Sequence, residues 1–158
     1  MAVEATFRQA SLADAPAVSE VYLASRKAFL PYARLAHSDD EVRAYIANVL
    51  IPGADVIVAE LDRQIVGLIA LTREGNTGWI AQLYLHPATV GQGIGTSLLG
   101  IAKDRLGPPI RLYTFQANTG AKRFYERHGF RAIAFGDGSE NEENCPDILY
   151  EWGGNDRC

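Results

Sequence analysis

The alternation of apolar and polar residues along the chain predicts a mixed α/β domain. Runs rich in β-branched residues predict strands, and apolar residues spaced three or four positions apart predict helices. The predicted strands cover residues 3–8, 54–60, 64–72, 79–86, 110–115, 130–135 and 148–152. Two predicted helices begin near Asp14 and near Ser38, and two more cover residues 93–106 and 118–128. This order favours one mixed sheet with helices packed on its faces.

Capping and turn residues mark the ends of several of these elements. Ser38 followed by Glu41 is a capping box, and Pro52-Gly53 ends the helix that this box begins. A three-residue break between the second and third strands predicts a hairpin. We expect residues 1–153 to form a single domain and residues 154–158 to be a disordered tail.

Composition and charge narrow the class of protein. The 158 residues are 47% hydrophobic and 22% charged, which is ordinary for a globular protein. A net charge of −4 gives no electrostatic reason to bind nucleic acid or an anionic membrane. No apolar run reaches the ~18 residues of a membrane span, and the first ten residues lack the apolar core of a signal peptide. We therefore expect a cytoplasmic location.

The two cysteines, Cys145 and Cys158, form neither a disulfide framework nor a metal-ligand spacing, so no metal is expected.

A glycine-rich loop, with Gly91, Gly93 and Gly95 at alternate positions, joins the strand 79–86 to the next helix. Glycine lets the backbone approach a ligand closely, and the first turn of a helix offers unpaired N–H groups with a partial positive charge. This combination is typical of a phosphate site. The spacing excludes a dinucleotide fingerprint, because Thr96 stands where its third glycine would be, and a P-loop, because no lysine follows Gly95. A tight turn without a ligand explains the loop as well.

A second segment, 118–130, combines a cap with an aromatic helix face. Asn118 can cap the helix and also offer a donor and an acceptor to a ligand. Ala121, Phe124, Tyr125 and His128 lie on adjacent faces of that helix, and Gly129 is its expected C-cap. A helix with only a packing role explains the same pattern.

Taken together, the two segments resemble the GCN5-related N-acetyltransferase (GNAT) superfamily. The family's Q/R-x-x-G-x-G/A loop, which binds the pyrophosphate of acetyl-coenzyme A, corresponds to residues 90–95. Its N-x-x-A-x-x-F-Y-E-x-x-G-F segment, beside the pantetheine arm and thioester, corresponds to residues 118–130. Val90 departs from the pattern, because the family usually has Gln or Arg there. We expect weaker or rearranged phosphate binding rather than its loss, since backbone amides make most of the contacts.

The resemblance implies a fold and a bound molecule. The fold is the GNAT acyl-CoA N-acyltransferase fold, a mostly antiparallel sheet of about seven strands that is splayed between strands 4 and 5, with about four helices. The molecule is acetyl-CoA or coenzyme A, with acetyl-CoA as the acyl-donor substrate. The residues implied for binding it are Leu83, Tyr84, Leu85, Val90, Gly91, Gln92, Gly93, Ile94, Gly95, Thr96, Asn118, Ala121, Phe124 and Tyr125.

Two catalytic roles follow from the resemblance. The backbone N–H of Leu85 would donate to the thioester oxygen where negative charge develops. Tyr125 would be the general acid that protonates the leaving thiolate, because a phenol pKa of ~10 is only modestly above a thiol pKa of ~8.5. An aromatic side chain that only packs is the alternative for Tyr125.

The general base has no such match. An alkylamine with a pKa of ~10.4 is less than about 0.1% neutral at pH 7, so its proton must be removed before it attacks. Relatives often place a glutamate at the positions of Trp79 or Tyr113, and Gln82 cannot act as a base. The candidates, besides a water chain to solvent, are His37, Glu41, His86, Asp137, Glu140, Glu142 and Glu143.

The resemblance places the acyl acceptor between two segments. One surrounds the break between the first two helices and includes Arg26 and Lys27, and the other is the acidic loop 137–144. The candidate acceptor-binding residues are Tyr32, His37, Asp137 and Glu142. Carboxylates in this loop would favour a cationic amine, although a charged hairpin loop without function explains them too.

We therefore predict an N-acetyltransferase that transfers the acetyl group of acetyl-CoA to a primary amine of a small molecule or peptide. The amine would attack directly in a ternary complex. The alternative is a non-catalytic acyl-CoA-binding sensor or interaction module with the same fold, which the missing strand glutamate favours. A homodimer paired through the last strands is common in the family and is possible here.

Overall fold

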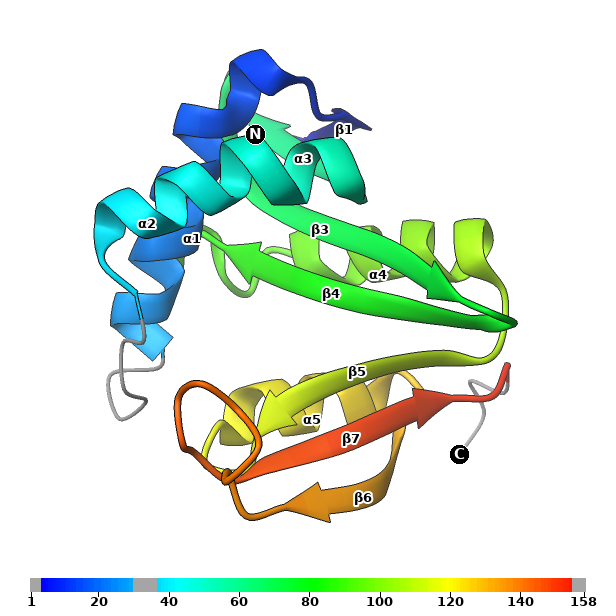
Figure 1. Ribbon diagram of the computed structural model, residues 1–158. Helices are drawn as coiled ribbons and strands as arrows, with labels where there is room; N and C mark the ends of the chain where they lie inside the picture. The colour runs from blue at the N-terminus through cyan, green and yellow to red at the C-terminus, as the bar shows by residue number, and fades with distance from the viewer. Residues whose placement is uncertain (1–3, 30–36, 155–158) are drawn as a thin grey trace.

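The computed structural model describes residues 4–29 and 37–154, which form a seven-stranded sheet with helices on both faces (Figure 1). The strand order is β1-β2-β3-β4-β5-β7-β6, and β4 and β5 form the parallel pair among otherwise antiparallel neighbours. The strands are β1 (Thr6–Gln9), β2 (Asp55–Leu61), β3 (Gln64–Glu74), β4 (Thr77–Leu85), β5 (Ile110–Phe115), β6 (Arg131–Gly136) and β7 (Asp147–Trp152). The helices are α1 (Ala15–Phe29), α2 (Asp39–Tyr45), α3 (Ile51–Gly53), α4 (Ile94–Leu106) and α5 (Thr119–Arg127). A π-helical turn, Ile46–Leu50, joins α2 to α3.

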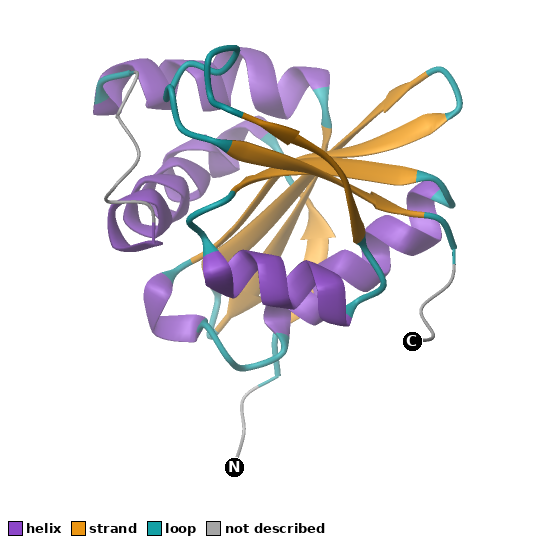
Figure 2. Cartoon of the chain, turned by 90° about the horizontal axis from the view of Figure 1, so that it is seen from below, coloured by secondary structure: helices purple, strands orange, loops and turns teal. Residues whose placement is uncertain are grey.

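Two clusters of buried apolar residues hold the helices against opposite faces of the sheet (Figure 2). The first cluster packs α1 and the π-helical turn against β2 and β3, and includes Val18 and Val58. The second packs α4 and α5 against the other face, and includes Ile57, Leu98 and Tyr150. Consecutive residues of β2 belong to different clusters, because side chains alternate between the two faces of a strand.

The strands β4 and β5 pair only near their first residues and then diverge. The parallel register joins Gly78 to Ile110 and Trp79 to Arg111. The pairing of β4 with β3 skips Ala81, which is a β-bulge, and a bulge bends a strand and increases its twist. In Figure 1, β4 and β5 are well separated at their carboxyl ends.

The structure confirms the predicted fold class, a mostly antiparallel mixed sheet of seven strands that is splayed between β4 and β5. The capping box is confirmed, because the Glu41 N–H donates to Ser38 Oγ at 3.2 Å and the Ser38 N–H donates to Glu41 Oε1 at 2.9 Å. The first strand was predicted over 3–8, and the described residues place it at Thr6–Gln9.

Other expectations about the chain as a whole stay predictions. Most of the predicted tail, 155–158, lies outside the described residues. Within the described ranges, no helix is long and apolar enough to cross a membrane. In the same part of the chain, no group of three or more His, Cys, Asp or Glu side chains is arranged to hold a metal ion.

Candidate functional site

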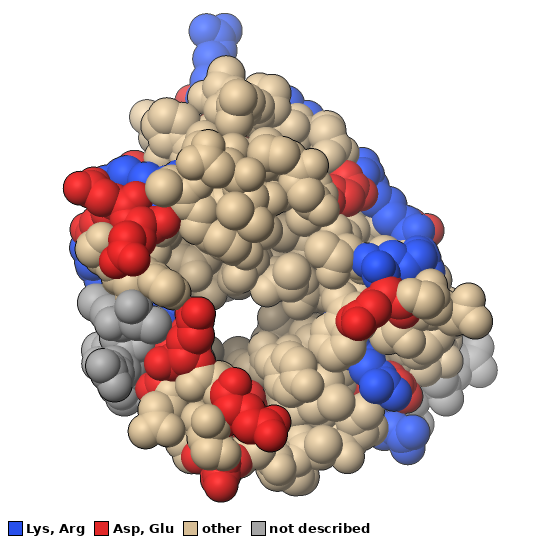
Figure 3. Space-filling view, in the orientation of Figure 1, with Lys and Arg blue, Asp and Glu red and all other residues tan. Residues whose placement is uncertain are grey.

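A cavity of about 1380 Å³ lies between the diverging strands β4 and β5. Its walls come from those two strands, the start of α5, the α1 and α2 side, and the loop between β6 and β7. Figure 3 shows an opening that passes through the molecule here, with Asp and Glu side chains gathered along part of its rim. Ligand pockets typically have volumes of ~300–1,000 Å³, so this cavity has room for parts of two reactants.

The glycine-rich loop stands at the amino end of α4. Gly91 and Gly93 have φ angles of 86° and 82°, a conformation that L side chains rarely adopt. A Cβ at either position would meet no atom within 4 Å, so the backbone conformation, not crowding, favours glycine there. The first turn of α4 carries no acidic side chain. Its N–H groups and partial positive charge therefore favour an anion at this place.

The two segments that carried the resemblance meet in space. A Cβ on Gly95 would lie 3.4 Å from the side chains of Leu85 and Phe124, so this glycine permits close packing of α4 against β4 and α5. Thr96 Oγ1 lies 3.2 Å from His128 Nε2 at the end of α5. The glycine-rich loop, the end of β4 and α5 therefore form one continuous surface.

The end of β4 presents a free backbone edge toward β5. The His86 N–H donates to the Val66 carbonyl of β3 at 2.7 Å. Because N–H groups alternate between the two edges of a strand, those of Leu83 and Leu85 face the β5 side. The pairing of β5 with β4 ends at Trp79, so this edge can bind an extended ligand as a strand would.

Tyr125 brings a buried hydroxyl to the cavity wall. Only 8% of this residue is exposed, and its ring packs against Phe130 and Tyr150 at centroid distances of 5.7 Å and 6.2 Å. Burial raises the pKa of the Tyr125 hydroxyl well above its usual value, so it is protonated at neutral pH. Within residues 4–29 and 37–154 the hydroxyl has no hydrogen-bond partner. It can therefore donate to a ligand in the cavity.

Asn118 caps α5 and lines the same cavity. Its side-chain oxygen accepts a hydrogen bond from the Ala121 N–H at 3.1 Å. The cap engages the oxygen and leaves the side-chain amide N–H groups as donors for a ligand.

The residues predicted to bind coenzyme A fall into two sets. The first set lines the cavity: Leu83, Tyr84, Asn118, Ala121 and Tyr125. The second set, Leu85, Phe124 and residues 90–96, is outside that lining and surrounds the start of α4, where the Ile94 side chain is buried in the core. Val90, half exposed in the loop, is in this second set.

A buried group around Tyr84 was missing from the sequence analysis. The rings of Tyr84 and Tyr22 lie 4.6 Å apart, and Arg26 interacts with the Tyr84 hydroxyl. Arg26 is only 9% exposed and forms an ion pair with Glu143 at 3.5 Å. Burial raises the pKa of Tyr84, and the neighbouring Arg26 opposes that shift. The i, i+4 spacing of Tyr22 and Arg26 was the available signal that both share one face of α1.

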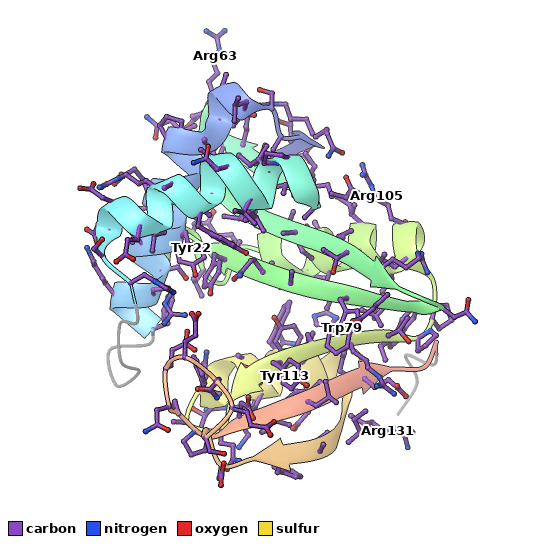
Figure 4. The ribbon with its side chains drawn as sticks, viewed as in Figure 1. Tyr22, Arg63, Trp79, Arg105, Tyr113 and Arg131 are labelled. Atoms are coloured by element: carbon purple, nitrogen blue, oxygen red, sulfur yellow. The ribbon has the colours of Figure 1, made fainter. Side chains whose placement is uncertain are left out.

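Trp79 and Tyr113, the strand positions at which the resemblance led us to look for a glutamate, form a stacked aromatic pair. The Trp79 and Tyr113 rings lie 5.8 Å apart with planes inclined by 19°, next to the point where β4 and β5 still pair (Figure 4). His86, another candidate base, caps a 3-10 turn by accepting from the Ala88 N–H at 3.1 Å. It is not among the residues that line the cavity.

Acidic side chains form much of the remaining wall. The carboxylates that line the cavity are Glu41, Asp137, Glu140, Glu142, Glu143 and Asp147. Asp147, at the start of β7, was not among the predicted candidates, although its place beside the acidic loop was visible in the sequence. Among the candidate acceptor-binding residues, His37 lies 2.9 Å from Glu142. Tyr32 lies outside the described residues.

Comparison with known proteins gives a family and a fold. Residues 52–132, just over half of the chain, match the family of acetyltransferase (GNAT) domains. No curated protein sequence matches the chain. A PaiA N-acetyltransferase from Thermoplasma acidophilum, solved in complex with coenzyme A, has a TM-score of 0.73 and 22% identity, covering 95% of this chain and 99% of that one.

Two Escherichia coli structures are similar over the same extent. The apo form of YjaB has a TM-score of 0.75 and 19% identity, covering 96% of this chain and 99% of that one. The ribosomal-protein-S18-alanine N-acetyltransferase has a TM-score of 0.75 and 13% identity, covering 96% of this chain and 95% of that one. At these identities the likeness establishes the fold.

Proposed function

The chain belongs to the GNAT acetyltransferase family, and from this membership we propose that it transfers the acetyl group of acetyl-CoA to a primary amine of a small molecule or peptide. The amine would attack the thioester directly in a ternary complex. One observation carries the proposal: the cavity between β4 and β5 has a free strand edge on one side and the buried hydroxyl of Tyr125 on another.

The donor side fits coenzyme A. The left-handed Gly91 and Gly93 precede a helix whose first turn carries no acidic group, which suits a pyrophosphate. The Leu83 backbone and the amide of Asn118 would bind the pantetheine arm where β4 leaves β5. Coenzyme A would supply the activated acetyl group as its thioester.

Two groups of the chain would act on the reacting thioester. The Leu85 N–H would donate to the carbonyl oxygen as negative charge develops on it. The Tyr125 hydroxyl would give its proton to the leaving sulfur. Because burial raises its pKa, this hydroxyl stays protonated across the working pH range, and the same shift makes it a weaker acid relative to a thiol with a pKa of ~8.5.

The proton of the amine would leave through the carboxylates that line the cavity, Glu41, Asp137, Glu140, Glu142, Glu143 and Asp147, which we call the acidic wall. Neither Trp79 nor Tyr113 carries a carboxylate. The carboxylates of the cavity, or water molecules between them and solvent, would therefore remove it. A diffuse route of this kind would tolerate loss of any one carboxylate better than a single glutamate base would.

A thiol-release assay tests the proposal. Acetyl-CoA is incubated with the protein and single amines, including simple alkylamines, amino acids, aminoglycosides and peptide N-termini. Free thiol and N-acetylated amine should appear in equal amounts and only when both substrates are present.

The stacked Trp79 and Tyr113, in place of a strand glutamate, favour one other candidate, a non-catalytic acyl-CoA-binding module. Acetyl-CoA binding in calorimetry, without thiol release from any amine, would support that candidate and contradict the enzymatic one.

A further inference from the structure

We infer that the acceptor is a small linear amine with a second positive charge, a diamine or polyamine, held by the acidic wall of the cavity while its other end reaches the thioester. This inference rests on the proposed function and narrows its acceptor. The wall lines the same cavity as the Tyr125 hydroxyl, which has no hydrogen-bond partner within the described residues, so an amine held at the wall shares the cavity with the proposed general acid.

The negative charge of the chain is concentrated in this cavity. Its lining holds six carboxylates against one arginine, Arg26, and one histidine, His37. The whole chain has a net charge of only −4 with histidine neutral, so the rest of the molecule is nearly neutral. A cavity lined by one sign of charge raises the local concentration of ligands with the opposite sign.

Three of these carboxylates are available to a cationic ligand. Glu143 pairs with Arg26, and Glu142 lies beside His37. Asp137, Glu140 and Asp147, in contrast, have no basic partner in the part of the chain that the structure describes. Asp137 accepts from the Ser139 N–H at 2.9 Å, and Asp147 from the Asn141 amide at 3.2 Å. Both bonds leave acceptor capacity for an ammonium group.

The acidic loop is held in place before any ligand arrives. The Asn141 side chain bonds to the backbone N–H and carbonyl of Cys145, at 3.1 Å and 2.7 Å. The Gln116 amide donates to the carbonyls of Gly136 and Asp147, at 2.9 Å and 3.0 Å. The side-chain positions are therefore partly preorganised, which lowers the entropy cost of binding.

The remaining lining suits the apolar stem of such an amine. Tyr45 and Tyr113 are 37% and 60% exposed and line the cavity together with Phe115. Aromatic faces bind methylene groups and also attract ammonium groups.

Contacts across the mouth favour a small acceptor over a polypeptide. The loop between β6 and β7 touches the α1 and α2 side through Arg26 with Glu143 and through His37 with Glu142. All four of these residues line the cavity. A flexible linear amine can enter such an opening end-on, whereas a peptide laid across the splayed strands would have to break both pairs.

The distribution of charge also explains why a second positively charged nitrogen on the acceptor matters. An amine with a single nitrogen would be held at the wall in its protonated form, which cannot attack the thioester. In a diamine, one ammonium occupies the wall and leaves the other nitrogen free to lose its proton near Tyr125. We therefore expect the charge at the far end of the acceptor to control its reactivity.

Three probes of equal stem length test this expectation: hexamethylenediamine, hexylamine and aminocaproic acid. They end in an ammonium, a methyl and a carboxylate group. We expect kcat/KM for the diamine to exceed that for hexylamine by about tenfold or more, with aminocaproic acid slowest. Raising the salt concentration should raise KM for the diamine alone. Equal values for the diamine and hexylamine, or faster turnover of an N-terminally blocked lysine peptide than of the diamine, would overturn the inference.

Variants connect the preference to the wall. Asp137→Asn combined with Glu140→Gln should lower kcat/KM for the diamine about tenfold more than kcat/KM for hexylamine, without changing KM for acetyl-CoA. Glu74→Gln, on β3 and away from the cavity, is the matched control and should leave all values unchanged. An equal loss for the diamine and hexylamine would contradict a role for these carboxylates in recognising charge.

Calorimetry separates this inference from the proposed function. The diamine and hexylamine are titrated into the protein saturated with coenzyme A, where no turnover occurs. Tighter binding of the diamine, weakened by the double substitution, supports the inference even if no amine is acetylated, an outcome that would defeat only the proposed function. Equal binding of the two amines overturns the inference whatever the catalytic result.

Discussion

The proposed donor and acceptor sites are built in different ways. The donor side is made of backbone: left-handed Gly91 and Gly93, the first turn of α4, and the free edge of β4. The acceptor side is made of side chains, mostly carboxylates on the loop between β6 and β7. The loop geometry depends on a few glycines, so this part of the donor site leaves a readable motif. Side-chain recognition leaves only local composition, which explains why the acceptor had to be inferred from the structure.

The largest effect is expected where the two sides meet. Tyr125→Phe should lower kcat about 100-fold, because general acid catalysis typically contributes ~10²–10⁴-fold, while acetyl-CoA affinity should change little. In the wild-type plot of kcat against pH, ionisation of Tyr125 should cause no loss of activity below about pH 10, because burial raises the pKa of this hydroxyl. Rapid-quench kinetics with calorimetry measures both quantities.

Tyr113→Phe is the matched control for that substitution. Tyr113 is 60% exposed and stacks on Trp79, so loss of its hydroxyl should leave kcat within about twofold. A normal rate for Tyr125→Phe with chemistry rate-limiting would contradict the assignment of the general acid.

The next effect concerns the donor side alone. Gly93→Ala places a side chain at a φ of 82° and should raise KM for acetyl-CoA about tenfold. Acceptor selectivity should not change. Gly100→Ala on the same helix α4, with no atom within 4 Å of the added Cβ, should leave KM unaltered. Equal KM values for the two variants would mean that the loop conformation does not determine donor binding.

A smaller effect, in the opposite direction, is expected at Val90. This residue is half exposed in the glycine-rich loop, so an added guanidinium can reach a bound phosphate from solvent. Val90→Arg should lower KM for acetyl-CoA about threefold, and the gain should disappear at high salt. Val90→Gln serves as an uncharged comparison. A higher KM for the arginine variant would show that the loop has adapted to an apolar residue.

The smallest effect is a titration on the acceptor side. The carboxylates of Glu142 and Glu41 raise the pKa of His37 above its usual 6.5. The contact between His37 and Glu142 is therefore favourable below the unfolded-state pKa and is lost as pH rises through the folded-state pKa. NMR titration should give a His37 midpoint above 6.5, and Glu142→Gln should move it down. An unchanged midpoint in the variant would show that Glu142 does not face this histidine in solution.

Much of the fold followed from local patterns in the sequence. Runs rich in β-branched residues located strands, and apolar residues three or four positions apart located helices. The Ser38–Glu41 capping box has its predicted bonds. The π-helical turn at Ile46–Leu50 was not predicted, because a turn of five residues is too short to alter the apolar pattern of the sequence recognisably. The bulge at Ala81 also has no local signature, since it depends on the register with β3.

The candidate site was predictable only where it follows a motif. The glycine-rich loop and the cap at Asn118 were found from residue type and spacing, and Tyr125 from the resemblance to the family motif. The cluster of Tyr84 with Tyr22, Arg26 and Glu143 joins residues from three distant segments, so it required the folded chain. Asp147 became a candidate for the acceptor site only when the cavity placed it opposite α1 and α2.

Initial-rate kinetics with both substrates varied gives the most direct test of acetyl transfer within one complex of the protein, acetyl-CoA and an amine. With hexamethylenediamine as the acceptor, double-reciprocal plots at several acetyl-CoA concentrations should intersect, because both substrates must be bound before the acetyl group moves. Parallel lines would indicate a covalent acetyl-enzyme and would contradict direct attack, and thiol release independent of the amine would contradict the transfer itself.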